Sequence, residues 1–183
     1  MCDLKIFNKI NYLVGTDQIS NESTVPFHNT VCEFLAEFSK ELIKNKKSNK
    51  FPDVKTLAFW CREKNIINFK KKFVSNKIRL GLGLIFHITP SNIPTNFAYS
   101  LIFGLIAGNS NIVKVPSKKF EQINIICETL KKVLKKKKYK LIKKMISIVK
   151  YSDNEIYTKK ISSICNARLI WGGDETVKKI RNF

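Results

Sequence analysis

The sequence predicts an α/β fold, a parallel sheet with helices on both faces, preceded by a helical segment at the amino terminus. From residue 78 onward, four short apolar runs alternate with segments of helical periodicity, which is typical of parallel strands joined by right-handed crossovers. Residues 1–77 combine helical spacing with a polar composition. An apolar content of 44% over 183 residues is sufficient for a globular protein with a hydrophobic core. We therefore expect a helical segment over 1–77 and an α/β domain over 78–183.

The amino-terminal segment contains two expected helices. In the first, over residues 24–45, apolar residues recur at helical spacing, namely Phe34, Leu35, Phe38, Leu42 and Ile43. Residues 45–51 are rich in Lys, Asn and Ser, and this composition predicts a loop. Asp53 is expected to cap a second helix, which carries Leu57, Phe59, Trp60 and Cys61.

The α/β part predicts strands and helices in strict alternation. The expected strands cover residues 82–88, 112–115, 146–149 and 167–171. The expected helices cover residues 94–107, 120–134 and 153–164, and a last one opens at Gly172 and Gly173. Open parallel sheets bind their ligands at the carboxyl ends of the strands. The loops 89–94, 114–118 and 171–176 are therefore the places to look for a site.

The formal charge is +20, from 34 basic and 14 acidic residues. Clustered cations attract phosphate, so the charge by itself suits RNA or an anionic surface. Only four of the basic residues are arginines, however, and arginine is the side chain that forks onto guanine edges and phosphates. The lysine run at 135–138 follows an amphipathic helix, where cations complement the helix dipole. We interpret the charge as a compositional bias and keep nucleic-acid binding as the alternative.

Five cysteines are scattered without C-x-x-C spacing, which argues against a metal site. An odd number of cysteines, with no secretory signal at the start, predicts reduced thiols in the cytoplasm. No apolar run reaches the ~20 residues that a membrane span requires. Cys165 and His87 are expected to be packed core residues.

The loop over residues 89–94 has the sequence Thr-Pro-Ser-Asn-Ile-Pro and follows the first strand of the α/β part. Its two prolines fix the backbone around one amide side chain. Such a rigid loop can aim an N–H group of Asn92 at a developing oxyanion, a contribution of roughly 3 kcal/mol in enzymes. Taken alone, the loop is as typical of a strand-to-helix turn in which Asn92 caps the helix.

Two further loops follow strands. A Gly-Asn turn at residue 108 leads to a short strand that ends near Lys114, where a lysine can reach the hydroxyls or phosphate of a nucleotide. Gly172 and Gly173 follow the last strand, and paired glycines let the backbone approach a pyrophosphate. Taken alone, Lys114 is more typical of an ordinary surface lysine, and the glycine pair lacks the spacing of the G-x-G-x-x-G motif.

In order and spacing, the three loops together resemble the aldehyde dehydrogenase superfamily. They are more similar still to the fatty acyl-CoA reductases of the bacterial bioluminescence type. The shared strings are His-x-x-Pro-x-Asn-x-Pro from residue 87, Gly-Asn-x-x-Ile-Val-Lys from residue 108 and Trp-Gly-Gly-Asp-Glu-Thr from residue 171. The resemblance covers residues 80–183 strongly and the first 77 weakly. It implies that residues 78–183 form a Rossmann-like, aldehyde dehydrogenase-like nucleotide-binding domain.

The resemblance implies roles for individual residues. Asn92 is implied as the catalytic residue, an oxyanion-hole amide for the thioester carbonyl. The residues implied in cofactor binding are Thr89, Pro90 and Ser91 at the nicotinamide, Lys114 at the adenosine ribose, and Gly172, Gly173 and Asp174 under the pyrophosphate.

Two positions depart from the family pattern. NAD-preferring relatives carry a glutamate for the ribose 2′-hydroxyl where this chain has Ser117, and Lys118 and Lys119 follow it. A 2′-phosphate would meet two positive charges there and no negative one, so we expect the cofactor to be NADPH, with Ser117 in its site. Lys178 stands where many relatives have the second glycine of the pyrophosphate turn, so this turn differs from theirs.

The reaction of the family is covalent. A cysteine thiolate attacks the acyl thioester, and hydride from the nicotinamide reduces the acyl-enzyme to an aldehyde. None of the five cysteines stands in the nucleophile's place, which the family puts in a separate catalytic domain after the glycine turn. We therefore expect a truncated NADPH-dependent acyl-CoA reductase that is inactive alone.

The expected substrate is a fatty acyl-CoA or an acyl-protein thioester. The expected partner is a separate catalytic-domain chain or a second copy of this chain, because the face on which a catalytic domain docks is apolar. Two alternatives stay open. One is a cationic module that binds RNA or an anionic surface, and the other is an aldehyde dehydrogenase relative of different specificity.

Overall fold

The computed structural model describes residues 2–3, 10–73, 77–152 and 155–182. Its main sheet consists of β2 (Asn11–Val14), β4 (Leu84–Ile88), β5 (Ser110–Lys114), β6 (Ile146–Lys150) and β7 (Ala167–Ile170). A two-stranded ribbon pairs β1 (Cys2–Asp3) with β3 (Gln18–Ile19). The helices are α1 (Asn29–Lys44), α2 (Pro52–Trp60), α3 (Glu63–Lys72), α4 (Asn96–Ile106), α5 (Glu121–Leu134), α6 (Lys140–Lys144), α7 (Glu155–Ile164) and α8 (Asp174–Arg181).

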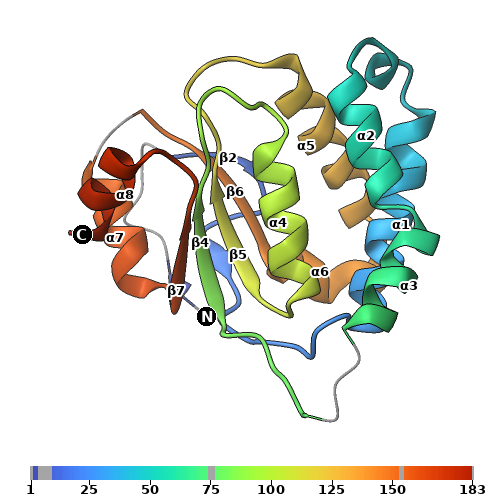
Figure 1. Cartoon of the computed structure of the whole chain (residues 1–183), viewed down its shortest axis with the longest axis horizontal. Helices are drawn as coiled ribbons and strands as arrows, with labels where there is room; N and C mark the ends of the chain where they lie inside the picture. Colours follow the sequence, from blue (N-terminus) through green and yellow to red (C-terminus); the bar gives the residue numbers. More distant parts are fainter. Residues whose placement is uncertain (1, 4–9, 74–76, 153–154, 183) are drawn as a thin grey trace.

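The main sheet lies between two helical layers, as the sequence predicted (Figure 1). Helices α1–α6 form the larger layer on one face, and α7 and α8 lie on the other side. The fold is therefore α/β with a Rossmann-like sheet. Among the described helices, none has both the length and the apolar character needed to cross a bilayer.

The strand order is β2-β6-β5-β4-β7. Strands β6, β5, β4 and β7 are parallel, and only β2 pairs antiparallel, at the edge next to β6. From β4 the chain winds in one direction to β5 and β6, and then returns to the other side of β4 as β7. The winding therefore reverses between β4 and β7, which is the switch point where open parallel sheets form their ligand crevice.

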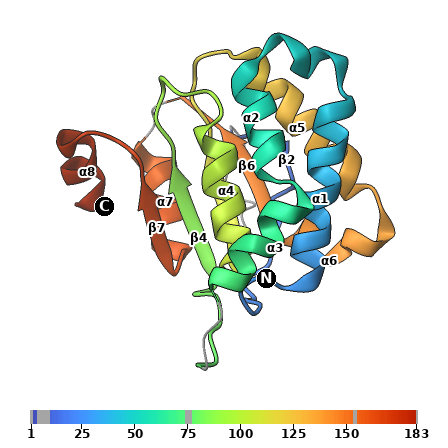
Figure 2. The same ribbon diagram turned by 45° about the vertical axis from the view of Figure 1, so that its right-hand side comes forward.

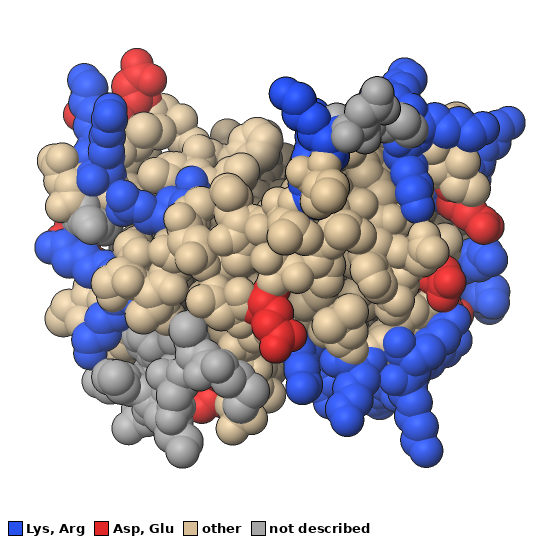
Figure 3. Space-filling model, turned by 90° about the horizontal axis from the view of Figure 1, so that it is seen from below, with Lys and Arg blue, Asp and Glu red and all other residues tan. Residues whose placement is uncertain are grey.

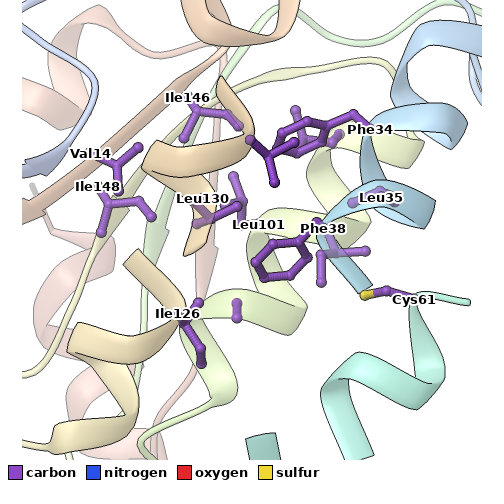
Figure 4. Packing of buried hydrophobic residues seen from close by; sticks show 14 of the residues in the cluster. Val14, Phe34, Leu35, Phe38, Cys61, Leu101, Ile126, Leu130, Ile146 and Ile148 are labelled. Atoms are coloured by element: carbon purple, nitrogen blue, oxygen red, sulfur yellow. The ribbon is translucent and has the colours of Figure 1, made fainter. Parts of the chain in front are cut away.

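The larger core lies under α1, α4 and α5 (Figure 4). Phe34, Leu35 and Phe38 of α1 point toward Leu101 of α4 and Leu130 of α5, and all five side chains are at most 2% exposed. These residues repeat at helical spacing on each helix, so each helix turns one apolar face to the same core. The amino-terminal helices and the sheet domain thus share a single core.

The second core lies on the opposite face of the sheet. Alternate residues of β4 point there, so Leu84 and Phe86 pack with Ile112 of β5 and with Ile161 of α7. Ile180 brings α8 into the same cluster. Arg168 of β7 also donates a hydrogen bond to the carbonyl oxygen of Ile180, with an Nη1 to O distance of 2.8 Å.

Polar contacts also attach α1 to the rest of the fold. The Ser39 hydroxyl donates to the carbonyl oxygen of Ala58 at 2.6 Å, which joins α1 to α2. The Glu37 carboxylate accepts hydrogen bonds from Lys136 and from the Tyr139 hydroxyl, both in the segment after α5. The bond from Lys136, followed by that from Tyr139, lowers the pKa of the Glu37 carboxyl to about 2.

Several boundaries differ from the predicted ones. The first helix begins at Asn29, not near residue 24, because the His28 side chain accepts a hydrogen bond from the Thr30 amide and caps it. Asp53 does not cap the second helix, which begins one residue earlier at Pro52 with Phe51 at the cap position. Proline suits that place, since its missing N–H would find no partner in the first turn. The start expected for the third helix of the α/β part, residue 153, lies outside the described residues.

The amino-terminal segment contains strands as well as helices, although its periodicity predicted helices alone. Strand β2 pairs with β6, and Tyr12 stands opposite Val149. Only Val14 of this four-residue strand is buried, so the alternation of apolar and polar residues is too short to be recognised in the sequence. Helix α3 was likewise not expected.

Candidate functional site

The three loops singled out from the sequence lie together at the carboxyl edge of the sheet. The Thr89 hydroxyl donates to the carbonyl oxygen of Lys114 at 2.8 Å, which ties the loop after β4 to the end of β5. The Trp171 amide donates to the carbonyl oxygen of Ile88 at 2.9 Å, which ties the loop after β7 to the end of β4. Figure 2 shows the turns that follow β4 and β5 at the same end of the molecule. The three loops therefore adjoin one another at the switch point, and we call the place that they border the crevice.

The loop after β4 presents its polar side chains outward. Ser91 and Asn92 are exposed, whereas Thr89 and Pro90 are half-buried beside the neighbouring strands. Helix α4 begins only at Asn96, and Thr95 occupies the cap position without a side-chain hydrogen bond. Asn92 is therefore not the helix cap, which was one of the two interpretations of this loop. Its exposed amide is available to a ligand.

The loop after β5 carries a group of lysines. Lys114 is the last residue of β5, and its Nζ lies 5.1 Å from the centre of the Tyr151 ring. The hydroxyl of the exposed Ser117 donates to the carbonyl oxygen of Tyr151 at 3.3 Å, so the loop is fixed to the chain after β6. Lys118 and Lys119 follow on the surface. This corner of the crevice is therefore positively charged.

The two glycines after β7 have different structural roles. A Cβ atom on Gly172 would lie 3.1 Å from the side chain of Thr176, so this position is tight. A Cβ atom on Gly173 would meet no described atom within 4 Å, and its φ of −71° suits any residue. Neither packing nor backbone conformation requires a glycine at 173. Its small size leaves the start of α8 open to close approach from solvent.

The start of α8 also carries negative charge. Asp174 and Glu175 stand in its first turn, where they oppose the positive end of the helix dipole. Lys178 lies 3.5 Å from a carboxylate oxygen of Glu175 and offsets part of that charge. An anion at this helix end would therefore depend on the backbone amides of its first turn.

Behind the loops lies a buried chain of polar side chains. The Trp171 indole donates from Nε1 to the Ser100 hydroxyl at 3.0 Å, and this hydroxyl lies 2.7 Å from Nδ1 of His87. Nε2 of His87 lies 2.9 Å from Oδ1 of Asn111, whose amide donates to the carbonyl oxygen of Asn109 at 2.6 Å. Burial lowers the pKa of His87 to about 4, so the ring is neutral near pH 7.

The sequence predicted that His87 is packed, and its 1% exposure confirms this. Sequence reasoning missed Ser100 and Asn111 as its partners. The available signal was a polar residue that interrupts an otherwise apolar strand or helix, since such a residue must find a hydrogen-bond partner once it is buried.

The four cysteines whose side chains the structure describes are poor nucleophiles. Cys61 and Cys127 are buried, and desolvation raises the pKa of both thiols, that of Cys127 to about 12. Cys32 and Cys165 are half-buried, and burial raises their pKa as well. These thiols therefore stay protonated at neutral pH, while the nucleophile is the thiolate. The packing of Cys165 against the second core agrees with its expected structural role.

Basic residues are distributed over more than the crevice. Figure 3 shows the opposite edge of the molecule, where most Lys and Arg lie toward the rim and the centre is mainly uncharged, with an acidic side chain in it. Several lysines near α1 and α5 pair with Glu37 and Glu41. Within the part of the chain that the structure describes, no group of three or more His, Cys, Asp or Glu could hold a metal ion.

Comparison with known proteins identifies the family. The model of a family described as Acyl-CoA reductase (LuxC) matches residues 24–182 of this chain. The matched range includes α1 to α8 and all three crevice loops. No curated protein sequence and no solved structure gives a significant match.

Proposed function

The chain belongs to the acyl-CoA reductase (LuxC) family, and from that premise we propose that it binds NADPH at the carboxyl edge of its sheet for the reduction of a fatty acyl thioester to an aldehyde. The observation that supports this proposal best is the convergence of three loops on the switch point between β4 and β7. Dinucleotides bind at this place in open parallel sheets.

The residues at the crevice fit such a cofactor. Gly173 leaves the amides of α8 accessible to a pyrophosphate, and Lys114 stands at the end of β5 for the adenosine ribose. Thr89, Pro90 and Ser91 lie beside it on the loop after β4, where we place the nicotinamide. The bound nicotinamide would supply hydride to the substrate. Gly172 and Asp174 complete the turn under the pyrophosphate.

Asn92 is proposed as the residue that polarises the substrate. Its amide is exposed on a loop held between two prolines, so an N–H group can face the carbonyl oxygen of the acyl thioester. A hydrogen bond to that oxygen strengthens as negative charge develops on it. The chain's own contribution to the chemistry is thus orientation and charge stabilisation.

The preference for NADPH rests on charge. A ribose 2′-phosphate would lie near Ser117, Lys118 and Lys119, and no carboxylate stands among these three residues. A titration of cofactor fluorescence should show tighter binding of NADPH than of NADH.

The variant Ser117→Glu should weaken NADPH binding by about tenfold, because it sets a carboxylate against the phosphate, and should not weaken NADH binding, because a carboxylate there can accept a hydrogen bond from the ribose 2′-hydroxyl. Ser117→Ala is the matched control, since it removes the hydroxyl without adding charge. Tighter binding of NADH by the unaltered chain would contradict the assignment.

The four cysteines whose side chains the structure describes are not expected to attack an acyl thioester, because their thiols stay protonated. The nucleophile is therefore proposed to be none of these four thiols. Incubation of the purified chain with a fatty acyl-CoA or an acyl-protein thioester and NADPH should give no aldehyde. Steady turnover by the chain alone would refute this.

The charge of +20 favours a second candidate function, the binding of RNA or an anionic surface. Polynucleotide binding would then fall steeply with salt, because bound lysines release counterions. We expect instead that, at a salt concentration that abolishes polynucleotide binding, the chain still binds a dinucleotide and saturates at a 1:1 ratio. Steep salt-dependent RNA binding without any dinucleotide binding would support the second function and contradict the first.

A further inference from the structure

The buried polar chain behind the crevice has a direction that its end groups fix. The indole nitrogen of Trp171 can only donate a hydrogen bond, and the carbonyl oxygen of Asn109 can only accept one. Because the amide nitrogen of Asn111 donates to Asn109, its Oδ1 faces His87 and can only accept, so the proton of the neutral ring sits on Nε2. Nδ1 of the ring then accepts from the Ser100 hydroxyl, which in turn accepts from the indole. Every bond in the chain is satisfied in this one arrangement.

The arrangement runs from the buried interior to the crevice. His87, Ser100 and Asn111 are at most 1% exposed, and they come from β4, α4 and β5. Trp171 is 39% exposed and directly precedes the two glycines of the loop after β7. Its ring is thus held at one edge by the interior and presents the remainder to solvent beside the crevice.

A glycine within α4 makes this arrangement possible. A Cβ atom on Gly104 would lie 1.9 Å from Oδ1 of Asn111 and 3.1 Å from Cε1 of His87. Glycine weakens a helix interior by about 1 kcal/mol relative to alanine. Helix α4 therefore has glycine, a poor helix former, at the position where the polar chain packs against it.

We propose that Ser100 and His87 are positioning residues that fix the Trp171 indole as one wall of the crevice, and that a planar ring of the bound dinucleotide packs against this wall. The second half of the proposal rests on the proposed function. The first half concerns the chain without ligand. Aromatic side chains stack on nucleobases through their π-faces, and a ring of fixed orientation loses less entropy when it does so.

The chain has two tryptophans, so Trp60→Phe leaves Trp171 as the single indole fluorophore. In that background, Ser100→Ala removes the hydroxyl that holds the indole. We expect the acrylamide quenching constant of Trp171 to rise about twofold, because the ring gains access to solvent, and NADPH binding to weaken about fivefold, as for the loss of one buried hydrogen bond. Ser163→Ala is the matched control, since its hydroxyl bonds only to Lys160 of the same helix in the described structure.

Trp171→Phe keeps an aromatic ring but removes the donor nitrogen. With NADPH fluorescence as the readout, Trp171→Phe should weaken binding about fivefold by itself, and Ser100→Ala should add less than twofold to it. If Ser100 acted only on stability, Ser100→Ala would weaken NADPH binding by the same factor in the Trp171→Phe variant as in the unaltered chain. If Ser100→Ala does not fold, the NADPH affinity of Trp171→Phe by itself tests whether a ring of the dinucleotide packs against Trp171.

Unchanged quenching of Trp171 in a folded Ser100→Ala variant would overturn the positioning role. Equal NADPH affinity of Trp171→Phe and the unaltered chain would overturn the ring-packing role. If the Trp60→Phe chain bound neither NADPH nor NADH, the proposed function would fail together with the ring-packing half. A quenching difference in that same chain would still support the positioning of Trp171 by Ser100.

Discussion

Gly104→Ala should destabilise the protein, although alanine is the better helix former. The position lies inside α4, where exchange of glycine for alanine ordinarily adds about 1 kcal/mol of stability. Here the new methyl group would lie 1.9 Å from Oδ1 of Asn111. That oxygen cannot simply move away, because the same side chain is fully buried and bonded to both His87 and Asn109.

The magnitude follows from the competing contributions. Overpacking of a dense core costs about 1–3 kcal/mol, and a buried polar group that loses its partner costs about 1–3 kcal/mol more. With about 2 kcal/mol from each of these two costs and a helix gain of about 1 kcal/mol, the net loss of unfolding free energy is about 3 kcal/mol. For a chain of 183 residues this corresponds to a fall in Tm of about 9 °C.

Gly173→Ala provides the matched control. Its added methyl group meets no described atom within 4 Å, and the backbone φ of −71° is allowed for alanine. We expect its free energy of unfolding to stay within about 0.5 kcal/mol of the unaltered chain. Urea unfolding followed by circular dichroism measures both variants. Equal or greater stability of Gly104→Ala would refute the claim that the polar chain occupies this space rigidly.

Two further outcomes can be measured on the same chain. Glu37→Gln should lower the free energy of unfolding at pH 7 by about 1 kcal/mol. Hydrogen bonds from Lys136 and then Tyr139 lower the pKa of Glu37 from 4.5 to about 2. The loss in the variant should therefore shrink as the pH falls through that range, because the unaltered carboxylate then takes up its proton. A deficit that grew on acidification in urea titrations would contradict the ion pair. Cys61 and Cys127 should react with an aromatic disulfide reagent only as fast as the chain unfolds, since burial keeps both thiols protonated and inaccessible; fast modification in the native state would exclude this.

The parallel sheet could be predicted because its strands are apolar runs that glycine or other turn residues separate from the helices. The runs that contain Leu84 and Ile146 are buried on both faces, so every residue except His87 and Lys150 is apolar or small and the pattern needs no alternation. Gly108 marked the end of α4 correctly, because its φ of +86° is accessible mainly to glycine. Strand β2 escaped prediction, since its pairing with β6 depends on a partner far away in the sequence.

The candidate site was predictable to the level of loops and not of contacts. Backbone topology brings the ends of parallel strands to one edge, so the convergence of the loops after β4, β5 and β7 followed from the order of the elements. The bond between Ser100 and His87 depends on the rotation of α4 about its axis, which periodicity does not fix. Roles such as that of Asn92 stay predictions, because they depend on the pose of a ligand.

The polar pair formed by His87 and Asn111 has a consequence for how the chain finds its native pairing. Both residues point to the same face of two adjacent parallel strands, and a slip of β5 against β4 by one residue would turn one of them toward the apolar cluster around Phe86. Parallel strands of Val, Ile and Leu offer many alignments of nearly equal hydrophobic energy. A buried hydrogen bond that forms in only one alignment can select that alignment. These two side chains therefore favour the native register of β4 and β5, which apolar residues alone would not distinguish.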